Sequence, residues 1–267
     1  IYCDEAKLKD HLIHKLSYNY NDAIGNGRIK YGLLYFWSSV AKTMSTEAIR
    51  VLLHSLEHSQ LIHMLSYQDE CGKTALHRCV DNKNNELIKV VLDSESEDEC
   101  NQLLSITDNL SGWTPLHMSS YRGDTESVRV MLNHVNQDMR CSLLQISSDG
   151  GNAPLHLTSY NDHTDIIKVI HESVTQSQWI NLLQMRDEDK MTVLQRAAYY
   201  NKQSFIDAVR NSVSDEEWIQ LLYTPIRKYN QRNRNDGRYQ GAVDLIDELR
   251  AAARVKSVLQ TGNNSGM

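Results

Sequence analysis

The sequence predicts an all-α fold built from repeated helical units, and three recurring columns of residues predict it. Leucines recur 39 or 40 residues apart, at Leu76, Leu116, Leu155 and Leu194. A branched aliphatic residue stands twelve residues after each of these leucines. A Leu-Leu pair begins 27 residues after each of them. Units of this length bury their apolar faces only against their neighbours, so the chain is expected to stack as a helical solenoid.

The same register extends in both directions and predicts about six units. The outer two depart from the pattern, with YFWS (35–38) and AVDL (242–245) at the place of the motif, as expected for end caps whose outer face meets water. The expected organisation is an N-terminal helical segment at 1–29, a repeat domain at 30–260 and a disordered tail at 261–267. The predicted units are about 30–68, 69–107, 108–147, 148–186, 187–225 and 236–260.

The first helix of a unit is clearest in GWTPLHMSSYRG, residues 112–123. Thr114 is a good N-cap, because its hydroxyl can accept a hydrogen bond from an exposed backbone N–H. Pro115 suits the first helical position, where no N–H donor is needed. The small residues Ser119 and Ser120 allow a neighbouring helix to approach closely.

Two further helices are expected in each unit. The stretch DTESVRVMLNHV carries Val128, Met131, Leu132 and Val135 at helical spacing, which predicts the second helix. Capping-box patterns stand just before the Leu-Leu pairs and predict a short third helix. These patterns are Ser96 to Glu99, Thr175 to Gln178 and Ser214 to Glu217.

These residues resemble the ankyrin repeat family, whose pattern is a Gly turn, T-P-L-H, small residues and a hydrophobic second helix. The segment 112–132 matches best and 72–92 nearly as well, whereas 151–171 has Ala153 for Thr and 190–210 has Gln195 for His. The period exceeds the roughly 33 residues usual for the family, and the surplus is assigned to the third helix. The resemblance implies a non-enzymatic module that binds a protein partner.

Composition narrows the function classes. The chain of 267 residues has a net charge of −6, which gives no general attraction to nucleic acid or anionic lipid. It has no apolar run of the roughly 20 residues that span a membrane. Five cysteines without a C-x-x-C pair favour reduced thiols and a cytoplasmic location. The chain does not begin with Met, so we expect a fragment or a processed form.

Histidines are the residues that most suggest chemistry. His77, His117 and His156 recur in register, but stacked helices lie about 8–10 Å apart, whereas zinc needs donors at about 2.0–2.1 Å. The resemblance implies instead that each bonds the turn backbone and the Thr hydroxyl. His54 and His58, at i and i+4 on one predicted helix, could hold zinc, but the H-E-x-x-H motif is absent. The sequence therefore predicts no metal, no cofactor and no catalytic residue.

Two charged stretches receive structural interpretations. The acidic run at 93–99 lacks the spacing of a calcium loop and is expected to form the solvated N-terminus of a third helix, where the helix dipole favours acids. The basic stretch at 225–239 is predicted to be an inserted loop. If this loop binds anything, an acidic protein surface is expected before nucleic acid.

The candidate partner-binding residues form two groups. Tyr121, Tyr160 and Tyr199 recur 39 residues apart after the first helix, and the residues that follow them are Arg122, Asn161 and Tyr200. Tyrosine is enriched in binding surfaces, although the same column could be a ladder that packs between units. The resemblance places this column on the concave face, and the finger tips would be Lys73, Trp113, Asn152 and Met191.

Three functions follow as expectations. The first is a monomeric protein-binding scaffold of unknown partner that uses the concave face and the finger turns. The second is a regulatory ankyrin domain cut from a larger channel, kinase or secreted effector. The third, an enzyme with an unrecognised site, would need a pocket with convergent polar groups.

Overall fold

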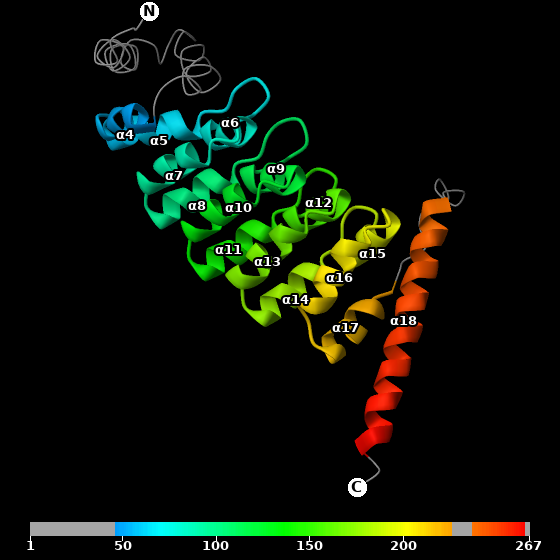
Figure 1. The fold of residues 1–267 in the computed structure, drawn as a ribbon. Coiled ribbons are helices and arrows are strands. Elements are labelled where there is room, and N and C mark those ends of the chain that lie inside the picture. Colours follow the sequence, from blue (N-terminus) through cyan, green and yellow to red (C-terminus); the bar gives the residue numbers. More distant parts are fainter. Residues whose placement is uncertain (1–45, 226–236, 265–267) are drawn as a thin grey trace, which may run out of the picture. The chain divides into compact units, whose positions relative to one another are not determined.

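The computed structural model describes residues 46–225 and 237–264 (Figure 1). Within those residues the chain forms fifteen α-helices and no strand, with one isolated antiparallel bridge between Arg186 and Thr192. The predicted all-α class is confirmed. Chain contacts separate two compact units, residues 46–119 with 126–139 and residues 120–125 with 140–264, which we describe in turn.

The first unit contains two helices of one repeat and all three helices of the next. α4 packs on α7, its equivalent one repeat later, and α6 packs on both α5 and α7. α4 ends at His54 and α5 begins at His58. The expectation that the two histidines lie on one helix is therefore wrong. The bounds are α4 Thr46–His54, α5 His58–Ser66, α6 Ala75–Asp81, α7 Asn85–Asp93 and α8 Glu97–Ser105. The helices α9 Pro115–Arg122, α10 Thr125–Asn133 and α11 Gln137–Gln145 contribute residues to both units.

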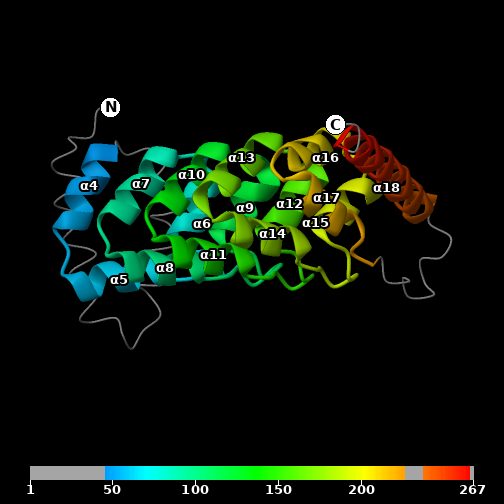
Figure 2. The ribbon, with the colours of Figure 1, turned by 90° about the horizontal axis from the view of Figure 1, so that it is seen from below.

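The second unit repeats the same packing. α12 contacts α15, α13 contacts α16 and α14 contacts α17, so each helix lies on its equivalent in the next repeat (Figure 2). The bounds are α12 Pro154–Asn161, α13 Thr164–Ser173, α14 Gln176–Gln184, α15 Val193–Tyr199, α16 Gln203–Asn211, α17 Asp215–Leu222 and α18 Gly237–Asn264. Trp179 and Phe205 are fully buried in this unit.

A short third helix is present in the described repeats before α18, and it begins as predicted in α8, α14 and α17. In each of the three predicted capping boxes, the N-cap hydroxyl accepts a hydrogen bond from the N3 backbone, and the N3 side chain accepts one from the N-cap backbone. The acidic run at 93–99 also has its expected role, because Glu97, Asp98 and Glu99 form the first turn of α8. The additional length of the repeat is therefore this short helix.

The C-terminal end differs from the expectation of a further degenerate repeat unit at about 236–260. Residues 237–264 form the single helix α18, so residues 261–264 are helical rather than part of a disordered tail. The left-handed turn position of the other repeats, held by Gly123, Asp162 and Asn201, is occupied here by Arg250 within the strong helix former ELRAAAR. Nothing in that sequence stops the helix.

α18 covers the end of the second unit. It packs on α15 and α17, and its side chains Ala242 and Ile246 are buried. The Arg250 Nε donates a hydrogen bond of 2.8 Å to the carbonyl oxygen of Leu222, the last residue of α17. One long helix therefore performs the capping role that we had assigned to a degenerate repeat.

Several expectations lie outside the described residues. These are the N-terminal segment 1–29, the degenerate motif at 35–38 and most of the basic stretch, residues 226–236. The number of repeats and their boundaries remain predictions.

The finger turns between repeats pack backbone against backbone. In the second unit Gly151 has φ of +70°, and a Cβ there would lie 2.5 Å from the Glu188 backbone nitrogen. In the first unit the Asn109 N–H donates to the Cys71 carbonyl oxygen at 2.9 Å. Glycine is used where the next finger leaves no room for a side chain.

Candidate functional site

The recurring histidines are structural elements of the scaffold. The Thr74 N–H donates to His77 Nδ1 at 3.2 Å, so the ring presents its Nε2–H, which donates to the Trp113 carbonyl oxygen at 2.9 Å. The Thr74 hydroxyl also lies 2.8 Å from Nδ1. His117 makes the same contacts to Thr114 at 3.2 and 2.8 Å. The predicted bonds to the turn backbone and the Thr hydroxyl are confirmed for His77 and His117. At His156 the N-cap is Ala153, which has no hydroxyl, and only its N–H donates to Nδ1, at 3.3 Å.

A glutamine replaces this histidine in the repeat before α18 and makes comparable bonds. Gln195 accepts from the Thr192 N–H at 3.1 Å and donates to the Thr224 carbonyl oxygen at 3.0 Å. At the intervening position, burial lowers the pKa of His156 to about 4, so the ring is neutral near pH 7. The side chains at these positions bond the backbone of the finger turns.

The second unit brings three of the predicted tyrosines together. Tyr200 stands edge-on to both Tyr160 and Tyr199, with ring centroids 5.0 Å apart in each pair. The Tyr160 hydroxyl donates to Asn152 Oδ1 at 2.6 Å, and burial raises the pKa of this phenol to about 12. Tyr160 therefore stabilises the fold as well as forming part of the surface.

A buried arginine supports the tyrosine cluster from within. The Arg196 guanidinium lies 5.8 Å from the Tyr160 ring centroid and 5.7 Å from that of Tyr199. It is paired with Asp187 and, at 2.7 Å, with Asp189. Because the arginine is fixed on both sides, the aromatic rings above it are held in a defined arrangement.

Tyr121 has a different position from the other tyrosines. It is 42% exposed, and Arg122 and Asn161 beside it are exposed as well. The Asn161 amide donates to the Tyr121 carbonyl oxygen at 2.8 Å, and the His163 Nε2 lies 3.0 Å from the same oxygen. The backbone is thus fixed while the phenol faces solvent.

The four finger residues are not equivalent. Asn152 supports Tyr160, as described, whereas Met191 is 2% exposed and cannot contact a partner as an exposed finger tip. In the first unit Lys73 is 2.9 Å from Asp81, and Trp113 is half-buried, rather than exposed as expected.

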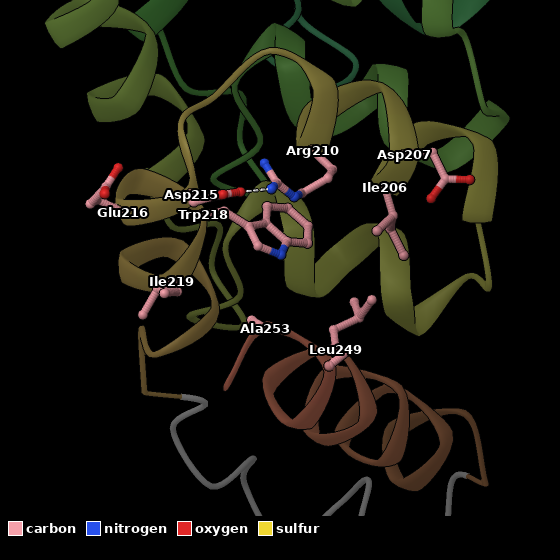
Figure 3. A pocket seen from close by; sticks show the side chains of 10 residues that line it. Ile206, Asp207, Arg210, Asp215, Glu216, Trp218, Ile219, Leu249 and Ala253 are labelled. Carbon is pink, nitrogen blue, oxygen red and sulfur yellow. Dashed lines mark hydrogen bonds and ion pairs between the residues drawn. The ribbon is translucent and has the colours of Figure 1, made fainter. Parts of the chain in front are cut away.

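A groove of about 330 Å³ lies between α16, α17 and α18 in the second unit (Figure 3). Its wall is apolar at Ile206, Trp218 and Leu249. Of the polar groups drawn there, Arg210 is paired with Asp215 and lies over the Trp218 ring at 5.6 Å. The groove has an apolar wall and an acidic rim. Its Arg210 and Asp215 side chains form an ion pair with each other.

Sequence reasoning missed the aspartate–arginine pairs under the fingers. Asp69 and Asp187 each cap their own finger backbone with one carboxylate oxygen and bind Arg78 or Arg196 with the other. The aspartates occupy equivalent positions before the T-P-L-H motif, which was the available signal. The arginines occur in only two of the four clear repeats, so they form no continuous column.

Comparison with known proteins identifies the repeats. The family described as Ankyrin repeats (3 copies) matches residues 94–176, which include α9, α10, α12 and α13. Residues 94–176 therefore match the ankyrin repeat family that the motifs resemble. Ankyrin repeats generally serve as protein–protein interaction modules and are typically non-enzymatic. No curated protein compared with the chain matches it significantly.

None of the helices in residues 46–225 and 237–264 is long and apolar enough to cross a membrane. The four cysteines in those ranges form no disulfide. Cys79 and Cys100 are buried, and burial raises the pKa of Cys100 to about 12, which makes it a poor nucleophile.

Proposed function

We propose that the chain is a non-enzymatic binding module whose protein partner contacts the ends of the first helices in the second unit. The surface comprises Tyr121 with Arg122 and Asn161, and the cluster of Tyr160, Tyr199 and Tyr200. The observation that carries the proposal is the exposed Tyr121 phenol on a fixed backbone. Aromatic side chains of this kind supply much of the binding energy at protein interfaces.

Preorganisation supports the same surface. The Tyr160 hydroxyl bond, the edge-on rings and Arg196 hold the cluster in place before any partner arrives. A partner therefore loses little free energy in ordering these side chains. Asn152 acts through Tyr160, and we leave the buried Met191 out of the surface.

The remaining features of the proposal are coarser. Trp113 and Lys73 offer contacts at the fingers of the first unit. We place the chain in the cytoplasm, which the absence of a disulfide among the described cysteines supports. We further propose that it is a monomer. The alternative is that the chain is a regulatory domain of a larger protein and uses the same surface there.

The test separates binding from folding. A photo-crosslinking amino acid placed at Tyr121 should capture a partner in the cells that make this chain, and Tyr121→Ala should then weaken that partner's affinity about thirtyfold, or ~2 kcal/mol. Tyr160→Ala should instead lower the melting temperature, because it removes a buried hydrogen bond and ring contacts.

Tyr223→Ala is the control, since Tyr223 is 40% exposed at the end of α17 and outside the proposed surface. It should leave partner affinity unchanged. Equal affinity of the parent and Tyr121→Ala for the captured partner would refute the assigned surface.

A further inference from the structure

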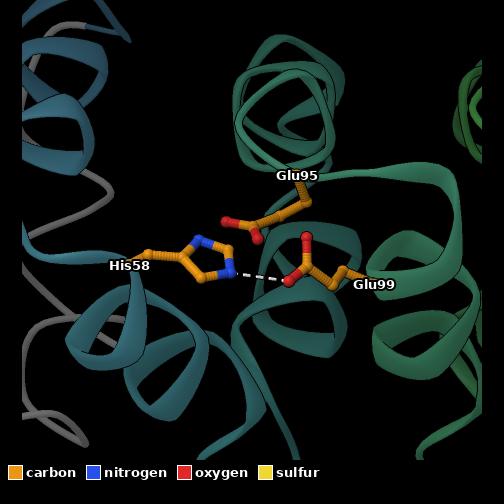
Figure 4. Close-up of side chains that lie close together, drawn as sticks. All are labelled: His58, Glu95 and Glu99. Atoms are coloured by element: carbon orange, nitrogen blue, oxygen red, sulfur yellow. Dashed lines mark hydrogen bonds and ion pairs between the residues drawn. The ribbon is translucent and has the colours of Figure 1, made fainter.

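A cluster in the first unit combines one imidazole with two carboxylates (Figure 4). His58 is the first residue of α5, Glu95 lies between α7 and α8, and Glu99 stands in the first turn of α8. One possible ligand atom from each residue lies within 4.8 Å of the other two. The His58 Nε2 is 2.7 Å from Glu99 Oε1.

Part of this cluster is ordinary scaffold. At the equivalent helix positions in the second unit, the Gln176 side chain donates to Glu217 Oε2 at 3.0 Å. A polar contact from the start of one third helix to the capping glutamate of the next therefore recurs without any ligand. The pair of His58 and Glu99 alone would need no further explanation.

Glu95 is not explained in this way. The equivalent positions in the next three repeats hold valine, and Val135 and Val174 are 2% and 9% exposed. Glu95 thus places a carboxyl group where two of these repeats bury a hydrocarbon and the third half-buries one, at Val213. Its Oε2 is closed off from solvent and has no hydrogen-bond partner among the described residues, an arrangement that costs stability unless something binds the oxygen.

The residues around the cluster carry negative charge, which favours a cation. Asp93 and Glu97 stand in the same acidic run as the two glutamates, at residues 93–99. The Cys100 thiol donates to the Leu92 carbonyl oxygen at 3.3 Å and is not one of the ligands.

We propose that His58, Glu95 and Glu99 bind one divalent cation of the zinc class. Tetrahedral zinc with bonds of about 2.0–2.2 Å separates its ligand atoms by roughly 3.3–3.5 Å. The three candidate ligand atoms already lie within 4.8 Å of one another, and His58 Nε2 and Glu99 Oε1, at 2.7 Å, would move slightly apart. His58 is 65% exposed and can make the small adjustment required. An imidazole ligand suits zinc, whereas calcium requires about six to eight oxygen ligands.

The bound cation would bridge the third helices of two successive repeats. The Glu95 oxygen would gain a partner, and α5 would be tied to α8. Three protein ligands leave a fourth position for water. Zinc binding should therefore stabilise the chain, because an ion that binds only the folded state raises the melting temperature.

The test titrates zinc into the chain after removal of metals with EDTA, using isothermal titration calorimetry at pH 7. Glu95→Val copies the residue of the other repeats, so it should fold. It should either lose one zinc equivalent or bind that zinc at least about tenfold more weakly. Its melting temperature should not rise when zinc is added. His58→Gln copies Gln176 and keeps the bond to Glu99. It should lose zinc binding and the zinc-induced rise in melting temperature, as Glu95→Val does.

Glu217→Gln is the matched control, because Glu217 occupies the position of Glu99 in a repeat that lacks the other two ligands. It should bind zinc as the parent does. The proposal is overturned if the parent binds no zinc, or if Glu95→Val keeps the parent's stoichiometry and affinity. It is also overturned if magnesium produces the same rise in melting temperature as zinc.

Discussion

In each repeat the side chain at the position of His77 hydrogen-bonds the backbone around the first helix. The charge state of this side chain decides the pH range in which these bonds are stable. At this position histidine and glutamine both accept from the N-cap backbone N–H and donate to a backbone carbonyl oxygen, as His77 and Gln195 show. Only histidine can take up a proton, and burial disfavours the charged form. The scaffold is therefore expected to weaken in acid where the residue is histidine.

His156→Gln should reduce the loss of stability in acid. The folded-state pKa of His156 is lowered to about 4 from the ordinary 6.5, so protonation favours the unfolded chain. Its contribution is fully present above pH 6.5 and is lost as the pH falls toward 4. Between pH 7 and pH 4.5 the free energy of unfolding of the variant should therefore fall by about 2–3 kcal/mol less than that of the parent.

Urea unfolding at the two pH values measures this difference. His54→Gln serves as the control, because His54 is exposed at the end of α4, and it should follow the parent. If His156→Gln loses as much stability in acid as the parent, the ring is not the titrating group.

At the scale of the element, each finger is held by the residue that precedes it, and repeats solve this in two ways. Asp187 accepts from the Met191 N–H at 3.0 Å and binds Arg196. In the preceding repeat Ser148 accepts from the Asn152 N–H at 3.2 Å, and a buried leucine, Leu157, stands where the arginine would be. The ionic and apolar versions are alternatives for one site.

Exchanging the versions should be tolerated only when both residues change. Arg196→Leu leaves the fully buried Asp187 carboxylate without its arginine and should cost about 3–5 kcal/mol. Asp187→Ser combined with Arg196→Leu copies the preceding repeat and should recover most of that loss. Chemical denaturation of both variants checks this, and a double variant no more stable than Arg196→Leu would contradict the account.

The sequence predicts elements well where a local pattern recurs, and poorly where one repeat departs from the pattern. The three helices of a repeat, their caps and the histidine bonds follow from residues within one unit. The end of α4 at His54 follows from the register too, since Asp93 is its equivalent at the end of α7, but histidine spacing alone misled. The continuous α18 could have been inferred from the helix-forming run at 248–254, which has no turn residue.

The candidate site was less predictable than the fold. The tyrosine column identifies positions, but whether a phenol is exposed depends on neighbours in other repeats. Tyr121 and Tyr160 are equivalent in sequence, yet only Tyr160 meets Asn152 and Tyr200. Glu95 gives no motif at all, and it becomes informative only because the equivalent positions hold valine.

At the scale of the whole molecule, repeats contribute stability mainly through contacts with their nearest neighbours. Among the residues that the structure describes, the strongest helix contacts within each unit join neighbouring repeats, as between α4 and α7 or α15 and α18. An end cap should therefore protect the repeat it covers more than a distant one. The buried Ile246 of α18 makes this testable.

Ile246→Ala should loosen the C-terminal repeat and leave the N-terminal repeats unchanged. Ile246 is 1% exposed, and its truncation removes packing worth about 2–5 kcal/mol. Hydrogen exchange should accelerate by at least about thirtyfold in α15 and α17, while α7 and α8 keep the parent's rates. Val255→Ala, in the same helix at a position that is 60% exposed, should change neither. An equal acceleration in α7 and α8 would show that the whole array unfolds as one cooperative unit, because the nearest-neighbour account requires the effect to fade with distance from the cap.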